Sequence, residues 1–158
     1  MGGASVDRDP GRYRAGVGIV LTDGAGHVWL GQRSGTHPGW QLPQGGIEPG
    51  EAIEAALWRE LMEEVGTADA RLLGATATWT YYEFPADSID RRNWDGQRHI
   101  WFALRFLGDD AQLDPRVLPD PEFDGWRWAT PAEAVAAVVP FKRDVYRTVF
   151  QRLGPLLG

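Results

Sequence analysis

The 158-residue sequence contains no cysteine. This absence excludes disulfide bonds, zinc or iron–sulfur sites with cysteine ligands, and a cysteine nucleophile. No apolar run is long enough to cross a membrane, and residues 1–14 lack the apolar core of a secretory signal. We therefore expect a cytoplasmic protein that does not bind a membrane.

Positive charge is also scarce. The 16 Lys and Arg residues are outnumbered by 22 Asp and Glu residues, and the net charge is -6. Proteins that coat long nucleic acids are usually basic. The charge balance therefore disfavours binding to duplex nucleic acid, whereas recognition of one nucleotide or of one nucleic-acid end stays open. The chain length predicts a single domain over residues 13–158, after a flexible lead over residues 1–12.

The sequence alternates between β-prone and helical segments. Strands are predicted at 13–21, 27–33, 99–107 and 126–129, with further β-prone sequence at 72–84 and a loop at 108–125. The first two strands are expected to form a hairpin. Helices are predicted at 51–65, 131–139 and 142–153. The mixture predicts an α/β (α+β) fold, arranged as three α/β/α layers around a sheet that is not purely parallel.

The helix predicted at 51–65 carries its acids in an unusual place. Its apolar stripe, spaced by four residues, consists of Ile53, Leu57, Leu61 and Val65. On the helical wheel Glu64 falls about 20° from Leu57, and Glu60 falls about 60° from it. Glu63 lies further round on the same flank. The acids therefore crowd the edge of the buried face instead of lying opposite to it.

Such an arrangement destabilises a helix. Glu60 and Glu64 form a like-charge pair one turn apart, and both lie near the helix C-terminus, where the dipole favours cations. Clustered carboxylates without cysteine suit a hard divalent cation, Mg²⁺ or Mn²⁺, and Mg²⁺ sites often include substrate phosphates. The alternative is a purely solubilising surface. The position beside the apolar stripe, and the nearby glycines Gly45 and Gly46, argue against it.

The segment from Gly45 to Thr67, GGIEPGEAIEAALWRELMEEVGT, resembles the signature box of the Nudix hydrolases. That box is a glycine, five residues, a glutamate, seven residues, and then Arg-Glu-apolar-x-Glu-Glu-x-Gly-apolar. The matching residues are Gly45, Glu51, Arg59, Glu60, Leu61, Glu63, Glu64 and Gly66. Thr67 departs from the last apolar position, and we expect only a minor effect on packing.

Further segments resemble one subgroup, the bacterial RNA pyrophosphohydrolases and the similar dinucleoside polyphosphate hydrolases. These segments are Tyr13-Arg14, Val17–Val20, Trp40-Gln41, Pro43–Ile47, Gly96-Gln97, Trp101-Phe102, Pro121–Trp128 and Phe141–Tyr146. The similarity spans roughly residues 13 to 150. It implies the Nudix α/β/α sandwich around a mixed sheet.

The resemblance implies a set of metal ligands. Glu60, Glu63 and Glu64 are expected to bind Mg²⁺, with Mn²⁺ or Zn²⁺ as substitutes, and the helical wheel independently groups these three residues. The carbonyl of Gly45 is expected to join them. Glu122 matches a carboxylate that the subgroup uses as an additional ligand or as a base.

The remaining catalytic assignments are supporting ones. Arg59 is expected to hold Glu51 and to steady the geometry between loop and helix. The general base that takes a proton from water is expected to be Glu63, Glu64 or Glu122, and the sequence leaves the choice open.

The expected substrate contacts come from five other residues. Arg33 is placed to meet phosphate or a base, Gln44 and Gln97 to contact the substrate, and Phe141 and Lys142 to contact a base. The predicted reaction removes pyrophosphate from the 5′-triphosphate end of RNA. The alternatives are a diadenosine polyphosphate hydrolase that releases ATP from the tetraphosphate, a nucleoside triphosphate clean-up enzyme, and a non-catalytic nucleotide sensor. A sensor is disfavoured because every glutamate of the box is present.

Overall fold

The structure is a computed structural model that describes residues 7–35, 39–117 and 119–158. Its strands are β1 (Tyr13–Thr22), β2 (Val28–Arg33), β3 (Trp40–Gln41), β4 (Gln44–Gly46), β5 (Ala70–Ala75), β6 (Thr80–Glu83), β7 (Gly96–Phe106) and β8 (Phe123–Ala129). Its α-helices are α1 (Ile53–Val65), α2 (Pro131–Ala137) and α3 (Arg143–Leu153). Short 3₁₀ helices are η1 (Pro10–Arg12), η2 (Ile89–Arg92), η3 (Asp110–Gln112), η4 (Pro140–Lys142) and η5 (Gly154–Leu156).

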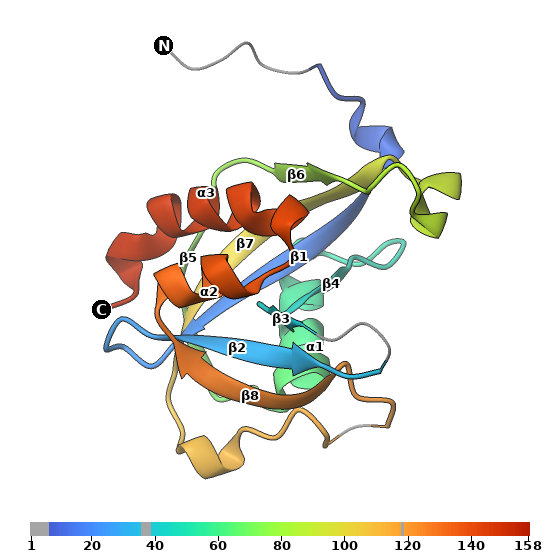
Figure 1. Ribbon diagram of the computed structural model, residues 1–158. Helices are drawn as coiled ribbons and strands as arrows, with labels where there is room; N and C mark the ends of the chain where they lie inside the picture. Colours follow the sequence, from blue (N-terminus) through green and yellow to red (C-terminus); the bar gives the residue numbers. More distant parts are fainter. Residues whose placement is uncertain (1–6, 36–38, 118) are drawn as a thin grey trace.

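The strands form one mixed sheet in the order β3-β2-β1-β7-β5, while β4, β6 and β8 pair with β1, β7 and β2 respectively. Helix α1 covers one face of the sheet, and α2 and α3 cover the other (Figure 1). These three layers confirm the predicted fold class. None of the helices described is long and apolar enough to cross a membrane.

The centre of the sheet is a parallel pair, β1 and β7, in register from Tyr13 opposite Gly96 to Thr22 opposite Arg105. The other strand pairs are antiparallel. The predicted hairpin between the first two strands is short, because β1 and β2 pair only where Thr22 meets Val28. Strand β2 then turns away and pairs along its length with β8.

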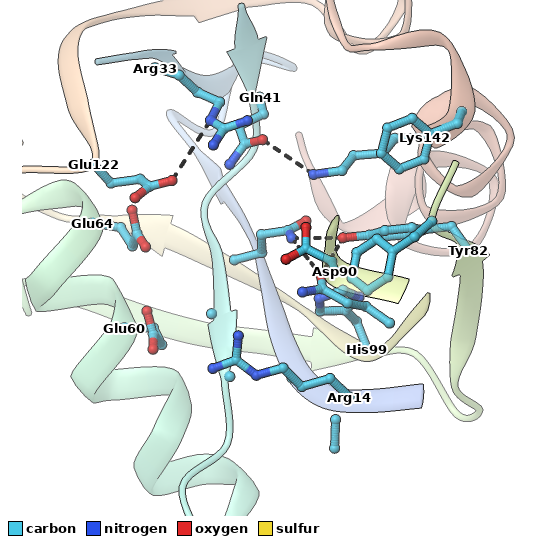
Figure 2. A pocket seen from close by; sticks show the side chains of 18 of the residues that line it. Arg14, Arg33, Gln41, Glu60, Glu64, Tyr82, Asp90, His99, Glu122 and Lys142 are labelled. Carbon is cyan, nitrogen blue, oxygen red and sulfur yellow. Dashed lines mark hydrogen bonds and ion pairs between the residues drawn. The ribbon is translucent and has the colours of Figure 1, made fainter. Parts of the chain in front are cut away.

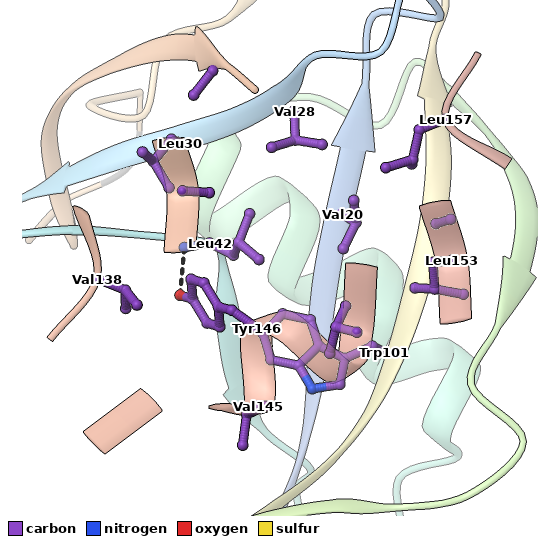
Figure 3. Close-up of a cluster of buried hydrophobic side chains, with 14 of the residues drawn as sticks. Val20, Val28, Leu30, Leu42, Trp101, Val138, Val145, Tyr146, Leu153 and Leu157 are labelled. Carbon is purple, nitrogen blue, oxygen red and sulfur yellow. Dashed lines mark hydrogen bonds between the residues drawn. The ribbon is translucent and has the colours of Figure 1, made fainter. Parts of the chain in front are cut away.

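Each face of the sheet has its own apolar core. On one face α1 contributes Ala56, Leu57, Leu61 and Val65. On the other face α3 contributes Val145, Tyr146, Val149 and Leu153 (Figure 3). The Tyr146 hydroxyl accepts a hydrogen bond from the Leu42 backbone N–H at 2.8 Å, which ties α3 to the chain before β4. The predicted apolar stripe is wrong at Ile53, which is 38% exposed together with the rest of the first turn of α1.

The helix ends follow the sequence signals. Gly66 adopts φ 87°, and its N–H donates to the carbonyls of Leu61 and Met62, which ends α1. Helix α2 begins with the predicted capping box. The Thr130 hydroxyl accepts from the Glu133 N–H, and the Glu133 carboxylate accepts from the Thr130 N–H.

Three predicted boundaries need correction. The β-prone segment 72–84 forms two strands, because β7 pairs with β5 and then with β6 on the same edge. The loop predicted at 108–125 contains η3, and β8 already begins at Phe123. The predicted flexible lead is structured from its second half: Arg8 pairs with Glu83 at 3.0 Å and Arg12 with Asp95 at 2.7 Å. Residues 1–6 of that lead lie outside the described residues.

Candidate active site

Two of the three carboxylates at the end of α1 are buried. Glu60 is 5% exposed and Glu64 is 9% exposed, as the helical wheel predicts. Glu63 is exposed. Arg59 Nη1 donates to Glu60 at 2.7 Å and to Glu63 at 3.2 Å. Glu60 and Glu64 are therefore buried within one turn of each other, and of these two only Glu60 accepts a hydrogen bond from Arg59.

Burial makes these carboxylates hard to ionise. Burial, and then the charges of Glu122, Glu60 and Glu63, raise the pKa of Glu64 to about 9, against the opposing effect of Arg33. Burial also raises the pKa of Glu60, although the Arg59 guanidinium opposes the shift. The Oε2 atom of Glu64 is buried and has no hydrogen-bond partner among the described residues. A buried acid without a partner requires an explanation, and a bound cation would supply one.

Strand β4 lies directly against Glu60. A Cβ atom at position 45 would lie 1.9–2.2 Å from the Glu60 carboxylate, so any residue other than glycine would displace that carboxylate. Pairing of Gly45 with Val17 of β1 fixes this strand beside the helix. The backbone of Gly45 is thus adjacent to Glu60, and the role of its carbonyl stays a prediction.

Glu51 and Arg59 form a separate supporting contact. The Arg59 guanidinium donates to both oxygens of Glu51, each at 2.8 Å, and to the Gly46 carbonyl at 2.9 Å. The Arg59 side chain, together with the Glu48 N–H, lowers the pKa of Glu51 to about 2. Arg59 therefore joins the chain before α1, the strand β4 and the acid Glu60. Neither Glu51 nor Arg59 lines the cleft.

A cleft of about 500 Å³ opens beside the buried acids (Figure 2). Its volume suits a nucleotide-sized ligand. Every residue predicted to bind metal or substrate lines it, namely Arg33, Gln44, Gly45, Glu60, Glu63, Glu64, Gln97, Glu122, Phe141 and Lys142. The glutamates lie on the α1 side, and Lys142 lies across the cleft from them (Figure 2).

Lys142 forms the far wall. It is 7% exposed, and its Nζ donates to Gln41 Oε1 at 3.3 Å and lies 5.2 Å from the centre of the Tyr82 ring. Burial, and then the charge of Arg33, lower its pKa to about 8. The neighbouring Phe141 is 38% exposed, and its ring lies 5.4 Å from that of Tyr82. A cation and an accessible aromatic ring therefore stand side by side.

A hydrogen-bonded group of three side chains connects β4, β6 and β7. Gln44 Nε2 donates to Tyr82 Oη and to Gln97 Oε1, each at 3.1 Å, and the Tyr82 hydroxyl contacts the same Gln97 oxygen. The Oε1 atom of Gln44 is buried and has no partner among the described residues. The three side chains thus hold one another in place, and Gln44 Oε1 remains as an acceptor without a donor.

Glu122 and Arg33 enter from the opposite edge of the sheet. Arg33 ends β2, and Glu122 immediately precedes β8. Glu122 Oε1 lies 3.7 Å from Arg33 Nε, and both side chains are partly exposed. Glu122 is also the strongest of the neighbouring charges that raise the pKa of Glu64. The fold thus brings this loop acid to the glutamates of α1.

Sequence reasoning missed several residues of the cleft. Arg14, Tyr82, Asp90 and His99 also line it. Burial, and then Lys142 and Arg14, lower the pKa of His99 to about 3, so its ring is neutral at neutral pH. Arg14 belongs to a segment that carries the family resemblance, but it was not predicted to bind substrate. Its positive charge near the start of a predicted strand was the one feature of the sequence that could have indicated this role.

The donor set suits a hard divalent cation that binds together with a phosphorylated ligand. Within residues 7–35, 39–117 and 119–158, no three acidic or histidine side chains converge into a complete metal site. Mg²⁺ commonly takes one or two carboxylates and completes its shell with waters and substrate phosphates. The unpaired oxygen of Glu64 and the adjacent carboxylate of Glu60 fit that requirement.

Comparison with known proteins agrees with this geometry. A family model described as the NUDIX domain matches residues 12–149. The RNA pyrophosphohydrolase of Rhodospirillum rubrum is 47% identical over 145 residues, which covers 89% of this chain and 87% of that protein. The RNA pyrophosphohydrolase of Caulobacter vibrioides is 44% identical, with 89% and 86% covered.

Solved structures share the fold at low sequence identity. The dihydroneopterin triphosphate pyrophosphohydrolase of E. coli has a TM-score of 0.66 at 19% identity and covers 88% of this chain and 98% of its own. The Ap4A hydrolase of C. elegans has a TM-score of 0.62 at 20% identity, with 89% and 98% covered. Residues of the signature box line the cleft, and the family model matches most of the chain. This chain therefore belongs to the Nudix hydrolase family.

Proposed function

We propose that this chain removes pyrophosphate from the 5′-triphosphate end of RNA in a reaction that requires Mg²⁺. The observation that carries the proposal is the division of the cleft: buried carboxylates line the α1 side, and Lys142 lines the other (Figure 2). A polyphosphate bound with a divalent cation needs both surfaces. The relatives that are RNA pyrophosphohydrolases, at 40–47% identity, support this choice of substrate.

Glu60, Glu64 and the carbonyl of Gly45 would hold the cation, and Glu63 and Glu122 line the same cleft. When bound, Mg²⁺ neutralises phosphate charge and lowers the pKa of a coordinated water. Nudix hydrolases typically use a divalent metal. Glu51 contributes through Arg59, which fixes the carboxylate of Glu60 in place.

The remaining residues bind and orient the substrate. Arg14, Arg33 and Lys142 surround the cleft with positive charge and would neutralise phosphate oxygens. Phe141 would stack against a base, because its ring is partly exposed beside the Lys142 ammonium. Gln44 and Gln97 would contact the substrate through the polar atoms that their mutual hydrogen bonds leave free.

The reaction consumes one water molecule. The water oxygen bonds to phosphorus, the anhydride P–O bond breaks, and the products are pyrophosphate and RNA with a 5′-monophosphate. A carboxylate must take the proton from this water. We assign this step to Glu122, because its side chain is 45% exposed at the cleft edge, whereas Glu64 is buried and Arg59 engages Glu63.

The decisive experiment compares rates and products for three substrates with Mg²⁺: a 5′-triphosphorylated RNA oligonucleotide, diadenosine tetraphosphate and a nucleoside triphosphate. We expect the RNA to give the highest kcat/KM and to release pyrophosphate. A higher kcat/KM for diadenosine tetraphosphate, with ATP as a product, would reassign the substrate. Preference for the mononucleotide would overturn the proposal, and absence of turnover of all three would indicate a nucleotide sensor.

A further inference from the structure

Ser34 holds the backbone on both sides of the Glu122 Cα atom. Its hydroxyl lies 2.7 Å from the carbonyl oxygen of Pro121 and 3.0 Å from that of Glu122. Its backbone N–H donates to the same Glu122 carbonyl at 3.0 Å. The single hydroxyl proton is therefore shared between two carbonyls, or alternates between them. Since these carbonyls belong to the two peptide groups that flank Glu122, the contacts fix the direction in which its side chain leaves the backbone.

The strand next to Glu122 is irregular at this point. Gln32 lies opposite Gly125 and Arg33 lies opposite Phe123, so Asp124 is the extra residue of a β-bulge. Bulges re-aim neighbouring side chains and are frequent beside active sites. Phe123 anchors the strand between Glu122 and the bulge, because its buried ring packs against Trp29 at 5.3 Å.

Before Glu122 the chain has little regular structure to hold it. Between β7 and β8 the described residues contain one short helix, η3. The Glu122 carboxylate makes no hydrogen bond within the part of the chain that the structure describes, and its ion pair is the 3.7 Å contact with Arg33. The orientation of this side chain is therefore determined by its backbone, and on the loop side Ser34 is what holds that backbone.

We propose that Ser34 is a positioning residue that directs the Glu122 side chain toward the part of the cleft that is lined by the glutamates of α1. The inference rests on the proposed function, and in particular on a reactive role for Glu122. Ser34 does not line the cleft and makes no hydrogen bond to the glutamates of α1. Without its hydroxyl, the peptide groups around Glu122 can rotate, and small displacements of a catalytic group reduce the rate strongly.

The first test compares Ser34→Ala with Ser34→Thr. We expect Ser34→Ala to lower kcat about tenfold with little change in KM, because the substrate-binding side chains are untouched. Ser34→Thr retains the hydroxyl and should restore most of the rate. Thr130→Ala is the matched control: it removes a hydroxyl that caps α2 outside the cleft. It should lower the melting temperature and leave kcat unchanged.

The second test asks whether Ser34 acts through Glu122. In a Glu122→Gln background, Ser34→Ala should cause no further loss of kcat, because the group that it positions is no longer a base. Multiplicative losses, or an unchanged kcat for Ser34→Ala alone, would overturn the proposal, as would a Glu122→Gln variant with wild-type kcat. If diadenosine tetraphosphate is the better substrate, the proposed function fails, and the same variants measured on that substrate still decide the role of Ser34.

Discussion

At the scale of single residues, Glu64 shows a conflict between stability and reactivity. It is 9% exposed, it lies near three other carboxylates, and one of its oxygens has no partner within the described residues. Such a group costs folding free energy unless a ligand compensates. Selection for stability alone would favour an amide or an apolar side chain at this position.

We therefore expect Glu64→Gln to lower kcat at least about a hundredfold. Mutation of a group that only hydrogen-bonds to a metal ligand already lowers activity by up to about a hundredfold, and loss of a ligand itself should cost more. The melting temperature without metal should be equal or higher, because the amide has no charge to desolvate. The increase in melting temperature on adding Mg²⁺ should disappear. Glu54→Gln, an exposed change on the same helix, is the control. A Glu64→Gln variant with wild-type turnover at saturating Mg²⁺ would refute the assignment.

Lys142 gives a prediction about pH, and it is the only lysine in the sequence. Burial lowers its pKa from the ordinary 10.5 to about 8, so the ammonium is charged below that pH and neutral above it. Because the charged form attracts phosphate, kcat/KM should decline above about pH 8. Folding stability should instead rise between about pH 8 and 10.5, because over this range the unfolded chain still holds the lysine proton and the folded protein does not.

The measurement is direct because a lysine-selective NMR titration of the free protein gives a single side-chain signal. Its midpoint should lie near 8. Lys142→Arg stays charged throughout this range, so its kcat/KM should lack the decline, even if the bulkier side chain lowers the overall value. An identical decline in Lys142→Arg would show that another group causes it.

At the scale of elements, β4 and α1 work as one unit, because Gly45 leaves room for the Glu60 carboxylate. Gly45→Ala would place a methyl group 1.9–2.2 Å from that carboxylate. We expect it to displace Glu60, to abolish most of the activity and to lower the melting temperature. Gly154→Ala is the matched control: position 154 has helical φ and ψ angles, and a Cβ atom there would meet nothing within 4 Å. It should leave turnover unchanged and cost only a little stability, because Pro155 disfavours a helical Ala before it. Similar losses in both variants would contradict the proposed packing.

Helix α1 shows how much a local pattern can predict. Its periodicity placed Glu60 and Glu64 at the buried edge, and the structure confirms their burial. The pattern failed at Ile53, because periodicity gives the direction of a side chain but not where along the helix burial begins. The split of segment 72–84 had a similar cause, since the change of partner along β7 depends on pairing between distant residues.

The opposite wall of the cleft could not be predicted from local sequence. Arg14 reaches the site because β1 and β7 pair in parallel, with Arg14 opposite Gln97 and Gly16 opposite His99. Tyr82 joins them through the pairing of β6 with β7. The register of β1 with β7 links residues more than 80 positions apart, and no helical or alternating pattern encodes either register. Gln97 was identified through the family resemblance, and the residues beside it were not.

At the scale of the whole molecule, the net charge of -6 opposes the binding of a polyanion. The cleft overcomes this opposition locally, with Arg14, Arg33 and Lys142 around a volume of about 500 Å³. Attraction is thus confined to the end of the substrate. The remainder of an RNA strand would lie over a surface on which acids outnumber bases, and it should add little binding energy.

Because attraction is confined to the cleft, kcat/KM should depend only weakly on salt concentration and on RNA length. Each phosphate charge neutralised on a single strand contributes about -0.7 to the slope of log affinity against log salt. Three or four such charges give a slope of about -2 to -3. We expect this slope in kcat/KM at constant Mg²⁺, and the same slope for 5′-triphosphorylated RNAs of different lengths. A slope that steepens with RNA length would require phosphate contacts outside the cleft. Because the protein is acidic overall, those contacts would have to come from a basic surface distinct from the residues of the cleft.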